Sequence, residues 1–558
     1  MTALSTISTN VRTVPDLPPQ AVVHGEVFTR RWVVDLIFDL LGYTADKDLS
    51  TVRLVEPACG SGAFLAAAAT RISASCRAHG RPISDALASI RAFDLLPRNV
   101  QASRRVVEKE LVDEGWQPDE ATQVAAAWVQ QGDYLLQPPS EHGADYVVGN
   151  PPYIRLEDVP DDRMKAYRSV CSTMGGRADI YVGFYEVALR SLNPDGQLGF
   201  ICADRWMRNQ YGSRLRQLVN RHFSMDLALV MHDVDAFYDQ VAAYPAITII
   251  SNRPQNEAVA ADTNRFFGAE QARGFLAWYF DADSQSTKKE SFQGARLPHW
   301  FDDDASWPTA SPARLAMLED LNERFGLLED PQAGTRVGIG IATGADKVFL
   351  TGNADLVEPD RLLPMAMVRD TTSGGLDWHG TYLVNPWTAE GDLVDLTAYP
   401  QLASYFEEHG AALRKRYVAT KQPHRWYKTI DKVDHELTRR PKLLFPDMKL
   451  TIHPVLDEGG LYPHHNLYFI VSDVWDMRVL GGLLLSKVAE AFVEAYAVKM
   501  RGGTLRFQAQ YLRRIRVPFP ADISEEDQTA LATAFEKRDV EGATAAALRV
   551  YGLSELPE

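Results

Sequence analysis

The stretch LVEPACGSGAFL, from Leu54 to Leu65, joins a short apolar run to the start of an Ala-rich helical segment. Gly60 and Gly62 lie between the two, and glycine lets a backbone approach a ligand closely because it carries no Cβ. The helix that follows offers unpaired N–H groups to an anionic group at its N-terminus. A strand, a glycine turn and a helix in this order predict a ligand crevice at the carboxyl edge of a parallel sheet.

Short apolar runs alternate with helical segments from about residue 52 to residue 252. Strands separated by helices in this way favour a doubly wound, mostly parallel α/β sheet. The last two runs, DLALVMH and AITIISN, are joined by a loop, and we expect them to form an antiparallel edge of that sheet. Proline, glycine and aspartate become frequent after residue 254, which indicates a domain boundary.

Acidic residues stand at the ends of three expected strands, at Glu56, Asp94 and Asp133. A carboxylate at Glu56 repels a pyrophosphate but attracts a cationic amine. Asp94 can accept hydrogen bonds from both ribose hydroxyls, although the alternative is a solvated strand end. Asp133 can accept from the amino group of an adenine ring. These residues suit a cofactor that carries an amine, a carboxylate and a ribose. S-adenosylmethionine has all three groups and fits this description better than NAD, so we predict S-adenosylmethionine as the cofactor.

A second motif, VVGNPPY, ends another expected strand beside this crevice. An exocyclic amine on a nucleobase is a poor nucleophile because its lone pair is delocalised into the ring. Two acceptors, the Asn150 side-chain oxygen and the Pro151 carbonyl, would draw the nitrogen toward a tetrahedral shape. Proline fixes φ near about −65°, so the direction of this carbonyl is preset. Tyr153 supplies a face for the base to stack on, worth roughly 1–3 kcal/mol.

These motifs together resemble the gamma class of DNA adenine-N6 methyltransferases of restriction-modification systems. The similarity covers most of the chain and keeps the order of that class, with a cofactor part, a catalytic part and then a recognition region. It implies a seven-stranded class I methyltransferase sheet, S-adenosylmethionine as cofactor, and the N6 amine of a flipped-out adenine as the methyl acceptor.

The resemblance also implies roles for individual residues. Thr29, in GEVFT, matches the position that touches the methionine carboxylate, and Phe237, in AFYDQVAAYPAITII, matches the residue that packs on the target base. The remaining implied positions are Glu56, Ala58, Gly60, Gly62, Asp94 and Asp133 for the cofactor, and Asn150, Pro151 and Tyr153 for catalysis.

The C-terminal half is the candidate for holding DNA, because a target base must be flipped out of a gripped duplex. Residues 411–450 contain eleven Lys or Arg against four Asp or Glu, and residues 500–520 hold five Arg and no acid. Basic residues mixed with Trp426 and Tyr427 favour a phosphate-binding cleft, although such a run is often only a solvated face. We expect a flexible tail over 1–20, a catalytic domain over 21–255, a connecting region over 256–330, an α+β target-recognition domain over 331–520 and a helical tail over 521–558.

The overall composition limits the class of protein. A formal net charge of −16 argues against a purely electrostatic, histone-like binder but leaves room for a local basic face. Four scattered cysteines without zinc spacing indicate reduced thiols in a cytoplasmic protein, and no metal site is expected. The sequence has no signal-peptide core and no run of about 18 apolar residues, so neither secretion nor a membrane span is expected.

Other functions stay open at this point. A glutamine side-chain amide and a base in RNA pose the same lone-pair problem, so the NPPY motif alone does not separate these substrates. Glutamine methyltransferases of this type are shorter and lack a large C-terminal domain. A non-catalytic DNA-binding subunit of a defence complex is the third reading. Double-stranded DNA is the expected partner, with a cognate restriction endonuclease or defence-complex subunits as further candidates.

Overall fold

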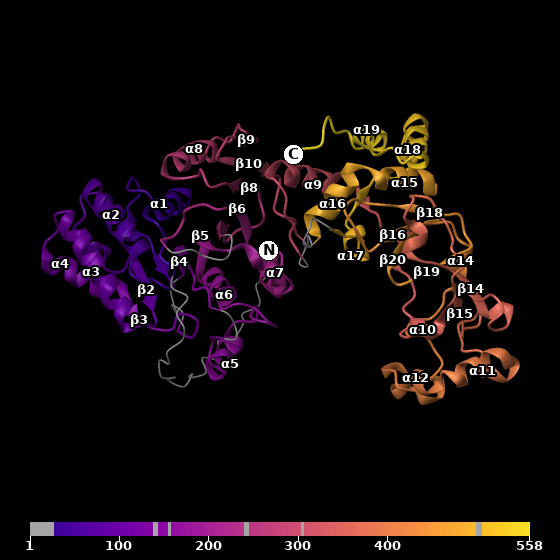
Figure 1. Cartoon of the computed structure of the whole chain (residues 1–558). Coiled ribbons are helices and arrows are strands. Elements are labelled where there is room, and N and C mark those ends of the chain that lie inside the picture. The colour runs from indigo at the N-terminus through magenta and orange to yellow at the C-terminus, as the bar shows by residue number, and fades with distance from the viewer. Residues whose placement is uncertain are drawn as a thin grey trace. The chain divides into compact units, whose positions relative to one another are not determined.

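The computed structural model describes residues 27–137, 143–154, 158–238, 245–302, 306–497 and 505–557 (Figure 1). The expected tail over 1–20 lies outside these residues. The chain divides into two compact units, Met1–Glu319 and Asp320–Glu558. Among the helices described, none is both long and apolar enough to cross a membrane.

Ten strands of the described chain form one sheet in the first unit, in the order β3-β2-β1-β4-β5-β7-β6-β8-β10-β9. The pairs β2–β3, β1–β2, β1–β4 and β4–β5 are parallel, and β7 is antiparallel to both of its neighbours. The doubly wound, mostly parallel sheet that the sequence predicts is therefore confirmed. The strands are β1 Leu54–Glu56, β2 Ile90–Asp94, β3 Val129–Gln131, β4 Ala144–Gly149, β5 Leu192–Ala203, β6 Ser224–Met231, β7 Pro245–Ser251, β8 Ala258–Thr263, β9 Ser286–Lys288 and β10 Phe292–Leu297.

The sheet continues beyond the seven strands expected from the resemblance. Strands β6 and β7 are antiparallel, as expected, but β6 also pairs in parallel with β8, and β8 pairs with β10. The β6–β7 pair therefore lies inside the sheet and not at its edge. The expected connecting region 256–330 thus supplies three strands, and the boundary between the two units falls after Glu319. The sequences AVAADT and FQGARL have little β-propensity of their own. Pairing of β8 with β6, and of β10 with β8 and β9, decides their conformation.

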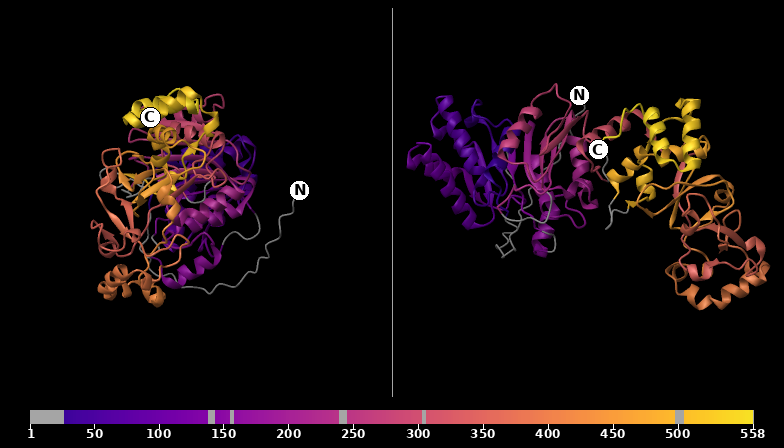
Figure 2. Two further views of the ribbon diagram at one scale, coloured as in Figure 1. Left: turned by 90° about the vertical axis from the view of Figure 1, so that its right-hand side faces the viewer. Right: turned by 45° about the horizontal axis from the view of Figure 1, so that its top comes forward.

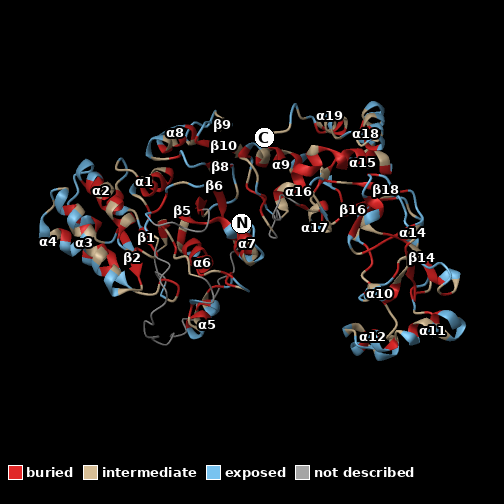
Figure 3. Cartoon of the chain, viewed as in Figure 1, coloured by how far each residue is buried: buried red, intermediate tan, exposed pale blue. Residues whose placement is uncertain are grey.

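Successive residues of the central strands face two different cores, because side chains alternate across a strand. Leu54 of β1 packs into one core and Val55 into the other, and Val148 and Val147 of β4 divide in the same way. Helices cover both faces of the sheet, and their inward sides are the buried ones (Figures 1, 2 and 3). The first core includes α1 Arg31–Leu40, α2 Ala63–Ala78, α3 Pro97–Asp113, α4 Pro118–Trp128 and α8 Ala269–Tyr279, and the second includes α5 Asp161–Val170, α6 Tyr181–Ser191 and α7 Ser213–His222.

The second unit combines small sheets with helices. One four-stranded sheet has the order β12-β20-β16-β18 and another has β13-β15-β14-β19. These strands are β12 Arg336–Ile339, β13 Leu350–Thr351, β14 Leu362–Ala366, β15 Tyr382–Val384, β16 Lys442–Pro446, β18 Val455–Asp457, β19 Tyr462–Pro463 and β20 Leu467–Val471. The expected α+β character of this half agrees with these elements.

The last residues of the chain pack into the second unit. Helices α18 (Glu525–Lys537) and α19 (Val540–Tyr551) pack on α15 (Met477–Leu485). The approach is close at Gly482, where a Cβ would lie 2.2 Å from the Leu531 carbonyl oxygen. The region 521–558 is thus helical, as expected, but it is part of this unit and not a separate tail.

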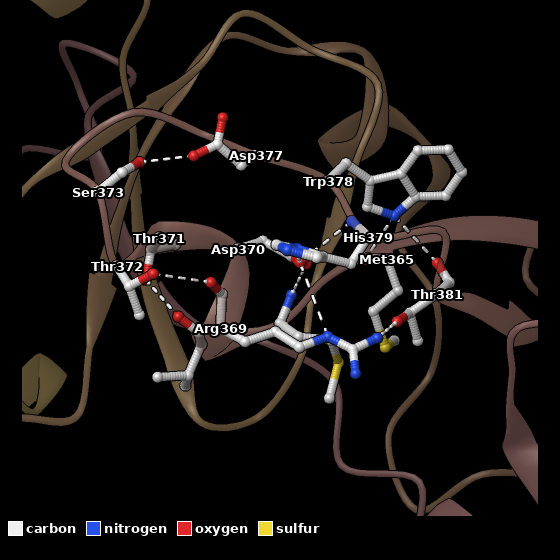
Figure 4. A network of polar contacts seen from close by, with 12 residues as sticks. Met365, Arg369, Asp370, Thr371, Thr372, Ser373, Asp377, Trp378, His379 and Thr381 are labelled. Atoms are coloured by element: carbon white, nitrogen blue, oxygen red, sulfur yellow. Dashed lines mark hydrogen bonds and ion pairs between the residues drawn. The ribbon is translucent and has the colours of Figure 1, made fainter.

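A loop between β14 and β15 is held by one buried carboxylate (Figure 4). Asp370 is fully buried and accepts hydrogen bonds from the Met367 N–H at 2.8 Å and from the His379 N–H at 3.2 Å. Its Oδ1 also lies 2.6 Å from His379 Nδ1. Trp378 Nε1 donates to the Met365 and Thr381 carbonyls, at 3.1 and 3.2 Å. Asp370 therefore joins the two arms of the loop.

Replacing Asp370 with Ala is expected to lower the free energy of unfolding by about 2 kcal/mol, because it leaves two part-buried N–H groups without their acceptor and removes the fully buried side chain that joins the loop. Asp377 in the same loop provides the control, since it is exposed and its side chain accepts from Ser373. Asp377→Ala should change stability by less than about 0.5 kcal/mol. Urea unfolding of the full-length chain measures both, and equal losses in the two variants would contradict this role.

Candidate functional site

Two adjoining cavities open at the carboxyl ends of β1, β2 and β4. The first, of about 560 Å³, is bordered by the segment 27–29, the β1–α2 turn and the VVGNPPY motif. The second, of about 710 Å³, extends past β2 and β3 to helices α5 and α6. Both are lined by Ala58, Asp94, Asn99 and Pro152. The two cavities are therefore parts of one crevice at the edge of the sheet that the sequence predicts.

The glycine turn at the start of α2 forms one wall of this crevice. Gly60 and Gly62 have φ angles of +53° and +92°, which favour glycine. A Cβ at Gly62 would lie 3.2 Å from the Ser103 Cα, whereas a Cβ at Gly60 would meet nothing within 4 Å. Ser103 Oγ donates to the Gly60 carbonyl at 2.9 Å. Gly62 thus permits close packing on α3, and Gly60 leaves the crevice open for a ligand.

Glu56 lies at the end of β1 and is only 2% exposed. Its Oε2 atom is buried and has no hydrogen-bond partner among the described residues. Burial raises the pKa of the Glu56 carboxyl well above its usual value, and the nearby charge of Asp94 adds to the rise. A cationic group in the crevice would offset both effects. The site therefore fits the ammonium group predicted for the cofactor.

Asp94 and Asp133 already carry bonds within the protein. The Asp94 carboxylate accepts from the Gly60 N–H at 2.9 Å and from Asn99 Nδ2 at 3.1 Å, and it lines both cavities. Asp133 lies two residues after β3 and accepts from the Tyr167 hydroxyl at 2.8 Å. Arg163 Nε lies 3.9 Å from the same Asp133 oxygen. Asp94 Oδ1 also accepts from the Leu96 N–H at 2.9 Å, and a carboxylate offers about four lone-pair positions in all.

Asn150 has a fixed orientation. Its Nδ2 donates to the Val27 carbonyl at 2.9 Å and lies 3.2 Å from Thr29 Oγ1. The Val27 carbonyl can only accept, so the amide nitrogen must point toward it. The other end of the amide, Oδ1, is buried and has no hydrogen-bond partner among the residues described. The Asn150 oxygen is therefore an oriented acceptor at the first cavity.

Tyr153 and Phe237 form a corner beside Asn150. Their ring centroids are 6.4 Å apart and their planes make an angle of 79°. Phe237 pairs with Thr29 in an antiparallel bridge, and the Arg30 N–H donates to the Ala236 carbonyl at 3.0 Å. The short segment that orients Asn150 therefore also holds Phe237. Residues about 200 positions apart are joined here, and no local sequence pattern signals the pairing.

The structure brings together most of the expected site residues. The residues that line the first cavity are Thr29, Glu56, Ala58, Gly60, Asp94, Asn150 and Tyr153, and Asp133 lines the second. Pro151 is buried and lines neither cavity, whereas Pro152 lines both. Sequence reasoning did not identify Asn99, Arg163 or Tyr167. Asn99 follows Asp94 at the start of a helix, which is a usable signal, but Arg163 and Tyr167 come from a distant helix.

The two basic runs differ from the expected phosphate-binding cleft. In the first, Arg416 donates to main-chain carbonyls of Trp426 and Lys428, at 2.8 and 2.7 Å, and Lys442 forms a buried ion pair with Asp457 at 2.9 Å. In the second, the described arginines bind within the protein, with Arg506 on Asp447, Arg513 on Glu329 and Arg516 on Asn322. Several cations of both runs are thus bound within the protein, while the exposed cations include Lys415, Lys421, Lys432 and Arg439. The phosphate-binding cleft stays a prediction.

Comparison with known proteins identifies the family. The family model described as Eco57I restriction-modification methylase matches residues 76–237. The type II methyltransferase M.PaeR7I of Pseudomonas aeruginosa is 43% identical over 535 residues, which are 95% of this chain and 92% of that protein. M.XhoI of Xanthomonas vasicola is 40% identical over 537 residues, 95% of this chain and 98% of that protein. M.BstVI of Geobacillus stearothermophilus is 38% identical over 91% of this chain and 92% of that protein. The chain therefore belongs to the type II methyltransferases of restriction-modification systems.

Proposed function

We propose that this protein transfers the methyl group of S-adenosylmethionine to the N6 amine of an adenine flipped out of double-stranded DNA, at a specific site. The observation that carries the proposal is the Asn150 amide. Its nitrogen is held by Val27 and Thr29, and its buried oxygen has no partner among the described residues. An oriented acceptor beside a cofactor crevice suits an amine that must be held at both N–H bonds.

Membership of the family makes S-adenosylmethionine the methyl donor, and this cofactor supplies an electrophilic methyl group on a cationic sulfonium. We assign Glu56 to the cofactor ammonium group, because its buried carboxylate needs a cation. Asp94 is assigned to the ribose hydroxyls. Thr29 and the N-terminus of α2 face the first cavity and are assigned to the cofactor carboxylate. The second cavity, beside Asp133, is assigned to the adenine ring of the cofactor.

The target amine is held by two acceptors, Asn150 Oδ1 and the Pro151 carbonyl. Each oxygen accepts one hydrogen bond from an N–H group of the amine. The two hydrogen bonds draw the nitrogen toward a tetrahedral shape and free its lone pair to attack the methyl group. The nitrogen would form a bond to the methyl carbon as the bond from that carbon to the cofactor sulfur breaks, so that S-adenosylhomocysteine leaves. The methylated nitrogen, which carries a positive charge, would then release one proton to water. Tyr153 and Phe237 receive the planar base in the corner between their rings. A strong general base is not required in this scheme.

The residue types support adenine as the target. Cytosine-C5 methyltransferases need a Pro-Cys nucleophile, and none of the four cysteines follows a proline. Cytosine-N4 enzymes typically carry Ser or Asp in place of Asn150. We also propose that the second unit, including the expected recognition region 331–520, holds the DNA target. A cognate restriction endonuclease or defence-complex subunits remain proposed partners.

Sequencing tests the proposed reaction directly. The chain is expressed in a host that lacks DNA methylation, and single-molecule sequencing of the genomic DNA then maps modified bases. A discrete motif carrying N6-methyladenine is the expected result. N4-methylcytosine in a motif would contradict the assignment of the base. An unmodified genome with full-length protein present would lead to an assay of RNA and protein substrates with labelled cofactor.

Thr29→Val is expected to lower kcat by about fivefold, because it removes one hydrogen bond of about 1 kcal/mol that orients Asn150. Thr29→Ser keeps the hydroxyl and should retain most of the activity. Steady-state methyl transfer at saturating cofactor and DNA measures this effect. A rise in the KM for the cofactor with unchanged kcat would show instead that Thr29 acts only on the cofactor.

A further inference from the structure

Three residues that can bind metal ions converge in the second unit. Asp346 begins α10 (Asp346–Phe349), while His464 and His465 lie between β19 and β20. One nitrogen of each ring and one Asp346 oxygen lie within 4.8 Å of one another. His464 Nε2 is 3.2 Å from Asp346 Oδ2, and the two ring centroids are 4.0 Å apart. Asp346 and His464 are 118 residues apart, so no local sequence pattern predicts this cluster.

The polar atoms of the two histidines are incompletely satisfied. His464 is only 2% exposed, and its Nδ1 atom is buried with no hydrogen-bond partner in the part of the chain described. His465 Nδ1 is buried and without a partner in the same way. Burying a polar atom without a partner costs free energy, and native proteins rarely leave one so. The contact between His464 Nε2 and Asp346 satisfies only one nitrogen of the pair.

The surrounding structure holds the Asp346 side chain and the backbone of both histidines in place. Thr343 Oγ1 donates to the Asp346 carboxylate oxygen that faces away from His464. The main-chain N–H of His464 donates to the Ala366 carbonyl at 3.0 Å, and the main-chain N–H of His465 donates to the Ile341 carbonyl at 3.1 Å. Carboxylates that bind metal ions are usually hydrogen-bonded in this way by a second group, which sets their direction.

The cluster is also reachable. His464 lines a hollow of about 750 Å³ together with Asn466, Thr351 and Arg369. Arg369 Nη2 donates to Thr381 Oγ1 at 2.6 Å, and both residues line this hollow (Figure 4). An ion bound by His464 would therefore have an entry path and room for water ligands.

We propose that Asp346, His464 and His465 bind one divalent transition-metal ion, with Zn²⁺ as the best match. Imidazole nitrogen and carboxylate oxygen are both common ligands of Zn²⁺, and three protein ligands with water complete its usual tetrahedral shell. The ion would tie the start of α10 to the turn before β20. This site is separate from the residues assigned to methyl transfer.

The test uses the full-length chain without an affinity tag, stripped with a chelator and then titrated with Zn²⁺ against a chromogenic competitor. The wild type should bind one equivalent. His465→Gln and Asp346→Asn should each weaken binding by more than about tenfold, whereas the exposed His424→Gln serves as the control and should bind like the wild type. Neither variant alters the fully buried core, so both are expected to fold.

Co²⁺ supplies a second measurement that does not depend on the variants. The wild type should develop visible absorption bands typical of tetrahedral or five-coordinate Co²⁺, and Zn²⁺ should abolish them. A wild type that takes up no Zn²⁺ and shows no Co²⁺ bands would overturn the proposal. Variants that bind Zn²⁺ as tightly as the His424→Gln control would overturn it as well.

Discussion

Asn150→Ala is expected to lower kcat for methyl transfer by about 100- to 1000-fold, with the affinities for cofactor and DNA within about twofold of wild type. The Asn150 oxygen is buried and oriented, and it accepts from the target amine chiefly as the nitrogen becomes tetrahedral. A preset acceptor of this kind acts on the transition state and contributes little to ground-state binding. Removing one oriented hydrogen-bond donor from an oxyanion hole typically lowers kcat by about 100- to 1000-fold, and we expect a loss of the same size for this oriented acceptor.

Single-turnover methyl transfer with labelled cofactor measures the kcat effect, and titration of each ligand measures the affinities. Asn353→Ala is the matched control, because Asn353 is exposed in the second unit and accepts only from a neighbouring loop N–H among the bonds described. This control should retain wild-type kcat. Wild-type activity in Asn150→Ala would remove the basis for holding the amine at two acceptors.

Glu56→Gln is expected to have two opposite effects. The affinity for S-adenosylmethionine should fall by about 100-fold, because the buried partner of its ammonium group loses its charge. The stability of the protein without cofactor should rise at neutral pH, because the wild type must bury an uncompensated carboxylate there. Loss of function with a gain in stability distinguishes a ligand-binding acid from a structural one.

The pH dependence of stability follows from the direction of the Glu56 shift. Its pKa is higher in the folded chain than in the unfolded chain, so the folded state binds the proton more tightly. The contribution of Glu56 to stability is therefore present at low pH and is lost as the pH rises from the usual glutamate pKa through the raised one. Glu56→Gln removes this dependence.

Thermal unfolding across that pH range and calorimetric titration with the cofactor measure these effects. Glu270→Gln is the control, because Glu270 is exposed at the start of α8 and outside the crevice. A lower Tm for Glu56→Gln without cofactor would contradict this account of the buried carboxylate.

The sequence by itself determined the central part of the fold and the location of the site. The strand, glycine turn and helix at residues 54–65 and the ordered strand ends at Glu56, Asp94 and Asn150 are local patterns. Parallel strands bring their carboxyl ends to one edge of a sheet, so residues that follow those strands must lie near one another. This geometry made the crevice predictable without any knowledge of long-range contacts.

Only the tertiary structure decided which partner each side chain takes. The Thr29 hydroxyl lies against Asn150, the Asp133 carboxylate accepts from Tyr167, and Arg506 pairs with Asp447. The sheet also extends through β8 and β10, although their sequences have low β-propensity. Such pairings join residues far apart in the chain, and they are chosen by burial and competition among many possible partners. The spacing of apolar residues in the sequence indicates whether one segment forms a helix or a strand. It does not indicate which distant segment will pack against that element.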